Sequence, residues 1–358
     1  MTSLADSLIM ALPGQHLGPY RLQGCIGRGG FGLIFQASSR TTQAQVAVKL
    51  LMPSNDPHAA AEFDAEGDLL RKLNKCEGVV TLVDSGIADI PVSINGLDVP
   101  LPFKYHVLSL ASGSLDELTS DPGRLAALAW VDRISLWRGA IKGIHQMHLK
   151  AVAHRDIKTD NCLLMVSGKR TEVRIADLGR SKDFSVTPTL LPQDYFHGRG
   201  DLRFAAPELL WSQGGQNGSD FRAADLYGLG SLLAELVTGH PMTALAIGSW
   251  QTAVNEGQRD FLAGIRRDLT VLRPQFRRAV DEVADQMPRS IRLDGAAILT
   301  QLCDPVPIAR FPPRRTTNKR VIEPGLSWLL RKADILVKRL SIEQKNQRRA
   351  AECERRIS

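Results

Sequence analysis

The sequence has few cysteines, no long hydrophobic run and no internal repeat, and each absence excludes a class of protein. Its five cysteines lie far apart without a C-x-x-C pair, which argues against a disulfide framework or a zinc cluster and favours a reducing, cytoplasmic location. No run of about 18 apolar residues occurs, so no transmembrane helix is expected. Residues 1–12 hold an apolar patch without a preceding basic region, which does not fit a secretory signal. We expect residues 1–17 to be a loosely ordered lead-in.

Charge is distributed unevenly along the chain. The net charge is +7, but residues 313–358 hold 13 basic and five acidic residues, whereas residues 1–312 hold 32 basic and 33 acidic ones. The basic character therefore belongs to a C-terminal tail and not to the body of the protein. An apolar content of 43% and a length of 358 residues suffice for one large domain with two lobes.

Eight residues, from His154 to Asn161, bring an acid, a cation and an amide close together in the chain. Asp156 could accept a proton from a hydroxyl group, and Asn161 could bind a metal ion through its side-chain oxygen. Lys158 could neutralise a phosphate. These side chains suit phosphoryl transfer, which depends mainly on positioning and charge neutralisation. A polar loop with a helix-capping aspartate is the alternative for this stretch alone.

The pattern H-R-D-x-K-x-x-N of this stretch resembles the catalytic loop of eukaryotic-type (Hanks-type) Ser/Thr protein kinases. The resemblance implies that Asp156 orients the substrate hydroxyl and accepts its proton, that Lys158 neutralises the transferring phosphoryl group, and that Asn161 binds a magnesium ion. It also favours Ser/Thr over Tyr substrates, because Lys158 lies within the loop. The other motifs of this family should then occur in the same order.

A glycine-rich turn lies near the N-terminus, in the stretch Gly27-Arg28-Gly29-Gly30-Phe31-Gly32. A Rossmann fold would require a helix directly after these glycines, but a β-prone run follows. Strand, turn and strand form a hairpin, whose backbone can close over nucleotide phosphates because glycine has no side chain. An ordinary glycine hairpin is the alternative. The residues predicted here to bind ATP are Gly27, Gly29, Gly32 and Ile34.

The run Val46-Ala47-Val48-Lys49 matches the V-A-I-K signature of the third kinase strand. By this resemblance, Ala47 lines the adenine pocket and Lys49 binds the α- and β-phosphates. A lysine in such an apolar run needs a partner. Residues 59–73 follow with helical spacing, and the kinase pattern selects Glu66 over Glu62 as the carboxylate that pairs with Lys49.

Asp177-Leu178-Gly179 resembles the D-F-G signature, with leucine in the place of phenylalanine, and implies that Asp177 binds magnesium. A polar stretch, 180–199, resembles an activation segment and holds Ser181, Ser185, Thr187, Thr189 and Tyr195; a phosphate there could pair with Arg155. The A-P-E signature follows at 206–208. Asp201 departs from the family, which usually has threonine there; it could still bond Lys158.

Further elements follow from periodicity and from the resemblance. We predict strands over 79–86 and 105–110, separated by a proline-containing loop over 90–102, with the hinge between the lobes at 108–113. Residues 130–149 have helical spacing. By resemblance, Asp225 holds the backbone of the catalytic loop, and Arg310 pairs with Glu208.

The tail after Pro313 lies beyond the resemblance. Its apolar residues recur with helical spacing, and basic pairs decorate the other faces. Three interpretations are open: the tail docks on the kinase core, contacts an acidic partner such as a membrane surface or nucleic acid, or remains a solvated end. Trp328 is its only aromatic residue, so a stacking surface for nucleic-acid bases is not indicated.

Together, the motifs predict an α+β, bilobal protein-kinase-like fold. Its N-lobe (about 18–108) is an antiparallel β-sheet with one helix, and its C-lobe (about 112–312) is mainly helical. The predicted activity is ATP- and magnesium-dependent transfer of a phosphoryl group to Ser/Thr hydroxyls of proteins, including autophosphorylation. The alternatives are a pseudokinase scaffold and a small-molecule phosphotransferase, and the A-P-E segment with Glu208 argues against the latter.

Overall fold

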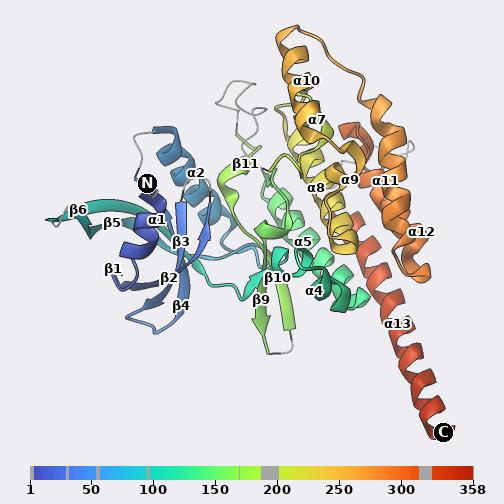
Figure 1. The fold of residues 1–358 in the computed structure, drawn as a ribbon, viewed down its shortest axis with the longest axis horizontal. Coiled ribbons are helices and arrows are strands. Elements are labelled where there is room, and N and C mark those ends of the chain that lie inside the picture. The colour runs from blue at the N-terminus through green and yellow to red at the C-terminus, as the bar shows by residue number, and fades with distance from the viewer. Residues whose placement is uncertain are drawn as a thin grey trace.

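The structure is a computed structural model that describes residues 4–29, 32–53, 57–94, 97–168, 170–186, 201–313 and 325–357. Its N-terminal part is an antiparallel β-sheet with accompanying helices, and its C-terminal part is largely helical (Figure 1). The predicted two-lobed α+β fold class is therefore confirmed.

The sheet of the N-lobe has six strands in the order β1-β2-β3-β4-β6-β5, and all neighbours are antiparallel. Val46, Val48 and Leu50 face the buried cluster of this lobe, whereas Ala47 and Lys49 alternate with them. The strands are β1 His16–Leu17, β2 Tyr20–Arg28, β3 Gly32–Ser39, β4 Gln45–Leu51, β5 Leu82–Ile94 and β6 Leu97–Ser109.

The proline-containing loop predicted over 90–102 is wrong, because these residues belong to the long β5–β6 hairpin. Pro91 lies opposite Pro100, and Pro102 lies opposite Asp89. Strand β6 pairs with β4 only through Tyr105–Ser109, so the distal hairpin is a two-stranded ribbon with open edges. Proline is tolerated at such an edge because no neighbouring strand needs its missing N–H group.

The loosely ordered lead-in is also wrong for the residues described. Helix α1 spans Leu4–Ala11, and Ala5, Leu8 and Leu12 are buried against the sheet. A helix of eight residues is marginal in isolation, so packing on the sheet decides its formation. The N-lobe thus carries a second helix beside α2, which spans Pro57–Leu73.

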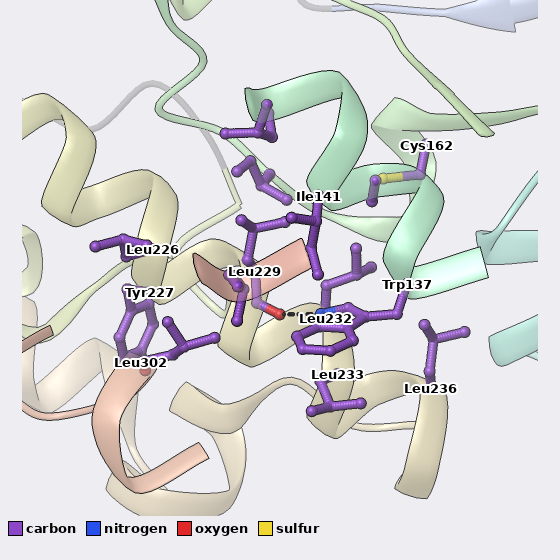
Figure 2. Close-up of a cluster of buried hydrophobic side chains, with 14 of the residues drawn as sticks. Trp137, Ile141, Cys162, Leu226, Tyr227, Leu229, Leu232, Leu233, Leu236 and Leu302 are labelled. Atoms are coloured by element: carbon purple, nitrogen blue, oxygen red, sulfur yellow. Dashed lines mark hydrogen bonds between the residues drawn. The ribbon is translucent and has the colours of Figure 1, made fainter. Parts of the chain in front are cut away.

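The core of the C-lobe forms around α5 (Trp130–Leu149) and α8 (Gly218–Thr238). The bounds of α5 coincide with the predicted range. Trp137 is fully buried, and its indole Nε1 donates to the backbone oxygen of Leu229 on α8 at 2.8 Å (Figure 2). Figure 2 shows leucine side chains of α8 gathered around this indole. This core supports the polar loops described below.

Shorter elements complete the C-lobe. The strands are β7 Gly113–Ser114, β8 Val152–Ala153, β9 Cys162–Ser167, β10 Arg170–Ile175 and β11 Lys182–Asp183. The helices are α3 Asp116–Thr119, α4 Pro122–Ala127, α7 Pro207–Leu210, α9 Met242–Ile247, α10 Trp250–Leu262, α11 Arg273–Asp285 and α12 Arg289–Leu302. Short 3₁₀ turns span Thr159–Asn161, Leu178–Arg180, Leu269–Leu272 and Pro307–Arg310.

The C-terminal tail forms α13, Ser327–Ile357. In its N-terminal half, one apolar stripe belongs to the core cluster of the C-lobe: Leu329, Ala333, Leu336 and Leu340. Leu326, directly before the helix, belongs to the same cluster. The C-terminal half extends away from the other helices (Figure 1). Within the described ranges, no helix is both long and apolar enough to cross a membrane.

Candidate active site

Lys49 connects two carboxylates that lie far apart in the sequence. Its Nζ lies 2.8 Å from both carboxylate oxygens of Glu66 on α2 and 3.0 Å from Oδ1 of Asp177. The predicted ion pair is therefore present, and Lys49 and Glu66 are both buried. Burial opposes a charge on Lys49, but the two carboxylates outweigh it and raise the pKa of the ammonium well above its usual value.

Asp177 shares this charge balance from the other lobe. Partial desolvation works to raise the pKa of its carboxyl group, but the Lys49 ammonium and a backbone N–H bond from Gly179 lower it below the usual value. The side chain keeps 48% of its surface accessible, so a ligand can reach it. Its backbone has φ 58°, in the left-handed region that a non-glycine residue rarely adopts.

The glycine-rich turn lies on the sheet beside Lys49. Gly27 lies opposite Ile34, and Ile34 lies opposite Lys49, so the three occupy one row across β2, β3 and β4. The amide of Gly29 donates to the carbonyl of Gly32 at 2.9 Å. A side chain at Gly32 would place Cβ 2.4 Å from the carbonyl oxygen of Leu50, so only glycine fits. Gly30 and Phe31 lie outside the described residues.

Ala47 lies two residues before Lys49 and opposite Leu108 of β6. It is 8% exposed. Its alternation with Val46 and Val48 puts it on the same face of the sheet as Lys49. The strand register thus brings together the residues that the sequence assigned to the adenine and phosphate sites.

The catalytic-loop stretch is anchored by a buried carboxylate of α8. Asp225 is fully buried and accepts the backbone N–H groups of His154 at 2.9 Å and Arg155 at 2.6 Å. It also contacts Nε2 of His148 at 2.7 Å. Asp225 therefore holds the loop backbone, as the resemblance implied.

Asp156 and Asn161 close the loop on themselves. Asn161 Nδ2 donates to the backbone oxygen of Asp156 at 2.8 Å, so the amide oxygen is the atom of this side chain that can accept a bond. The backbone oxygen of Asn161 accepts the N–H of Ala176 at 2.9 Å. Because Ala176 precedes Asp177, this bond joins the backbone of the loop to the segment that carries Asp177.

Asn161 and Asp177 supply oxygen donors, which are the ligands that magnesium prefers. Among the described residues, no group of three His, Cys, Asp or Glu side chains could hold a metal ion by itself. A magnesium ion at this place would therefore take its other ligands from water and phosphate, as it usually does in nucleotide sites. The donor set fits magnesium in that form.

Asp201, the departure from the family pattern, pairs with Arg203. Both carboxylate oxygens of Asp201 contact the Arg203 guanidinium, with Nε 2.9 Å from each. Lys158 lies 3.9 Å from Asp160. Asp201 thus pairs with Arg203 in place of the proposed bond to Lys158. Partial burial works to raise the pKa of Asp201, but Arg203 and, more weakly, the charge of Lys158 lower it below the usual value.

Two further buried carboxylates, Glu208 and Glu235, bond to residues near the active-site motifs. Arg310 makes two 2.7 Å bonds to Glu208, which confirms the predicted pair. Glu235 of α8 accepts a hydrogen bond from Thr159 Oγ1 at 2.9 Å, and burial raises its pKa to about 8. Sequence reasoning missed Glu235, since nothing in the run of α8 distinguishes a buried acid from a solvated one.

A cavity of about 1130 Å³ lies between α2, residues 181–186 and the segment after α7. Lys72, Arg155, Lys182 and Arg266 line it, and Lys72 pairs there with Asp183 at 2.5 Å. It contains none of the residues predicted to bind ATP or magnesium. The hydroxyl residues Thr187, Thr189 and Tyr195 of the predicted activation segment lie outside the described residues.

Comparisons with known proteins show which family this chain resembles. The family model for the protein kinase domain matches residues 20–321. The chain is similar to the inhibitor of nuclear factor kappa-B kinase subunit alpha of Gallus gallus (27% identical over 232 residues, 63% of this chain and 28% of that protein). It is also similar to mitogen-activated protein kinase kinase 7 of Arabidopsis thaliana (28% over 221 residues, 60% of this chain and 62% of that protein). A third relative is the lectin-domain containing receptor kinase VI.4 of Arabidopsis thaliana (29% over 228 residues, 61% of this chain and 29% of that protein). The chain spans less than two thirds of the length of each of these relatives.

Proposed function

This chain belongs to the protein kinase family, and on that premise we propose that it transfers the γ-phosphoryl group of ATP to serine and threonine hydroxyls of proteins, including its own. The observation that carries the proposal is the position of Lys49, whose Nζ lies within 3.0 Å of both Glu66 and Asp177. A lysine held in this way offers a fixed cation to nucleotide phosphates beside a carboxylate that can bind magnesium.

In the proposed mechanism, Asp156 orients the acceptor hydroxyl and accepts its proton. Lys158, two residues further on, neutralises the transferring phosphoryl group. Lys49, fixed by Glu66, binds the α- and β-phosphates. Since Asp225 holds the backbone of this loop in the buried core, the catalytic groups are positioned before the substrate arrives.

The nucleotide site is assigned to the glycine-rich turn and to strands β3 and β4. Gly27, Gly29 and Gly32 would approach the phosphates, and Ile34 and Ala47 would contact the adenine. Asn161 and Asp177 would hold two magnesium ions, which neutralise phosphate charge when bound. The magnesium requirement is part of the proposal and rests on the oxygen donors of these two side chains.

The cavity beside Arg155 holds cations that could bind an activating phosphate, among them Lys72, which would exchange its present partner Asp183 for the phosphate. Lys72, Arg155 and Lys182 line it, and a phosphorylated residue of the segment 180–199 would bring two negative charges to these cations. We include such phosphorylation in the proposal.

The tail and the location of the protein complete the proposal. The buried stripe of α13 supports docking on the C-lobe, and contact of its basic face with an acidic partner is the alternative. A reducing, cytoplasmic location rests on the wide spacing of the cysteines.

The test is incubation of the purified chain with labelled ATP and magnesium, beside Asp156→Ala. A matched control is Asp281→Ala, which removes an exposed carboxylate of α11. We expect label on the protein or on a general protein substrate, phosphoserine and phosphothreonine in the hydrolysate, and a loss of at least about 100-fold only in Asp156→Ala.

Nucleotide binding without transfer in the unsubstituted chain would instead support the pseudokinase scaffold. Label on small-molecule acceptors alone would support a small-molecule phosphotransferase. Transfer that survives in Asp156→Ala would refute the role of this aspartate.

A further inference from the structure

His106 is a buried titratable side chain between the sheet and helix α2, and the mechanism above does not use it. It is 4% exposed and lies on β6 directly opposite Lys49. Its ring stacks on Phe63 of α2, with centroids 4.1 Å apart and planes inclined by 6°. Its Nε2 lies 2.9 Å from the backbone oxygen of Phe63. Since a carbonyl oxygen only accepts, Nε2 carries the proton and the neutral ring has an unprotonated Nδ1.

Gly67 makes this close approach possible. A Cβ atom at position 67 would lie 2.6 Å from Cε1 of His106, which no real contact allows. Glycine is unfavourable within a helix, and at this position it lets α2 approach the imidazole. The ring, the carbonyl of Phe63 and the gap at Gly67 therefore form one contact, which we call the His106 latch.

The His106 latch acts on the helix turn that carries the catalytic ion pair. Phe63 and Glu66 lie one turn apart on α2, and both oxygens of Glu66 lie 2.8 Å from Lys49. We propose that His106 is a positioning residue: its neutral ring holds α2 against the sheet so that Glu66 stays on Lys49, and protonation of the ring releases that hold. This inference rests on the proposed kinase function.

The charges around the ring give the direction of the pH dependence. Lys49 on β4 and Arg71 on α2 face it as cations, Glu66 on α2 faces it as an anion, and Ser85 opposite it on β5 is uncharged. Burial lowers the pKa of His106; the carbonyl of Phe63 and Glu66 oppose this, while Lys49 and Arg71 reinforce it. Among the described residues, Nδ1 has no hydrogen-bond partner, so a proton there would be buried unpaired.

The sign follows from linkage. The ring in the latched arrangement has a pKa below the ordinary value of 6.5, so the latched arrangement binds a proton less readily than an arrangement in which α2 has moved away. The hold is complete above pH 6.5 and weakens as the pH falls below it. Acid should therefore loosen α2 and separate Glu66 from Lys49.

Three variants separate positioning from mere packing. His106→Phe keeps a ring for stacking but cannot donate to Phe63. His106→Gln can donate an N–H at a similar reach and does not titrate. His16→Phe is the matched control, because His16 is exposed on β1 of the same sheet. The readouts are kcat/KM for ATP between pH 8 and pH 5.5, and amide hydrogen exchange of α2 (57–73) relative to α5 at each pH.

At pH 8 we expect kcat/KM to fall about three- to tenfold in His106→Phe, with faster exchange of α2, and to recover at least half of the loss in His106→Gln. Towards pH 5.5, the unsubstituted chain should lose about threefold more activity than His106→Gln, and its α2 should exchange faster. His16→Phe should follow the unsubstituted chain.

Two results would overturn the proposal and leave the kinase function intact. One is a ratio of kcat/KM between the unsubstituted chain and His106→Gln that stays constant from pH 8 to pH 5.5. The other is amide exchange of α2 that no His106 substitution alters. A chain that transfers no phosphate would refute the proposed function instead. In that case the exchange of α2 alone still decides whether the latch holds the helix.

Discussion

The docking of α13 on the C-lobe can be tested with two neighbouring residues of one helix. Leu336 is 1% exposed and belongs to the core cluster, whereas Ile335 is 50% exposed. Each change to alanine removes the same number of carbon atoms. Leu336→Ala should lower the free energy of unfolding by about 2–5 kcal/mol, because it leaves a cavity in packed surroundings. Ile335→Ala should change it by about 0.5 kcal/mol or less.

A second buried position extends the test. Leu329 is fully buried and lies two turns before Leu336 on the same stripe. At that separation the two losses should add to within about 0.5 kcal/mol, so the double variant should lose about 4–10 kcal/mol. If the N-terminal half of α13 docks as one unit, both Leu329→Ala and Leu336→Ala should lower the free energy of unfolding.

The assay is equilibrium urea unfolding, followed by circular dichroism and by tryptophan fluorescence, to which the buried Trp137 contributes. Ile335→Ala is the control for changes in helix propensity and handling. Equal effects of Leu336→Ala and Ile335→Ala would refute the reasoning, because they would mean that α13 does not pack on the lobe in solution. Phosphoryl transfer by folded Leu336→Ala should persist, since this residue touches none of the proposed catalytic groups.

Three further predictions concern the buried polar residues of the C-lobe. Burial raises the pKa of Glu235 to about 8, so the folded chain binds this proton more tightly than the unfolded chain. As the pH rises from about 4.5 to 8, the free energy of unfolding should therefore fall by up to about 1.4 kcal/mol per pH unit. Urea unfolding of Glu235→Gln should lack this slope. Arg310→Met should lower the free energy of unfolding by about 3–5 kcal/mol in the same assay, because it leaves the Glu208 carboxylate buried without its partner. Addition of Glu208→Gln should recover part of this loss, and a double variant that recovers none would contradict the reasoning. Asp225→Asn should lower the free energy of unfolding by about 1–3 kcal/mol, because an amide NH₂ replaces one oxygen that accepts a loop N–H group. It should lower kcat more than it lowers the affinity for ADP. An effect on ADP affinity alone would contradict the anchoring role.

The sequence predicted the elements whose information is local. Helix 130–149 has apolar spacing over five turns, and its bounds agree with α5. The choice of Glu66 over Glu62 followed from a fixed spacing along one helix, and the structure places Glu66 on Lys49. The signatures around Lys49 and Asp177 occur in a fixed order in the chain, so the contact between these two residues, 3.0 Å in the structure, could be inferred.

The errors occurred where tertiary contacts override local signals. Prolines 91, 100 and 102 indicated a loop, but on an open two-stranded ribbon they remove no bond to a further strand. Helix α1 is too short to be stable alone and forms because Leu8 and Leu12 find an apolar sheet face. His106 and Glu235 have no sequence signal, since their importance lies in burial, which a single chain does not display.

Burial also separates the polar residues of the active-site motifs into two groups with different tasks. Asp177 keeps 48% of its side chain accessible and Asp156 is half-buried, which agrees with the contacts to substrate and nucleotide that we propose for them. Asp225 and Arg310 are fully buried. Asp225 accepts two backbone N–H groups and contacts His148, and Arg310 donates to the Glu208 carboxylate and to backbone carbonyls. Buried charges with satisfied partners resist displacement, because moving them would leave an unpaired charge in the core. The loop that carries the proposed catalytic aspartate is thus anchored by a buried and paired charge, and a fixed geometry of this kind is what phosphoryl transfer demands of a protein.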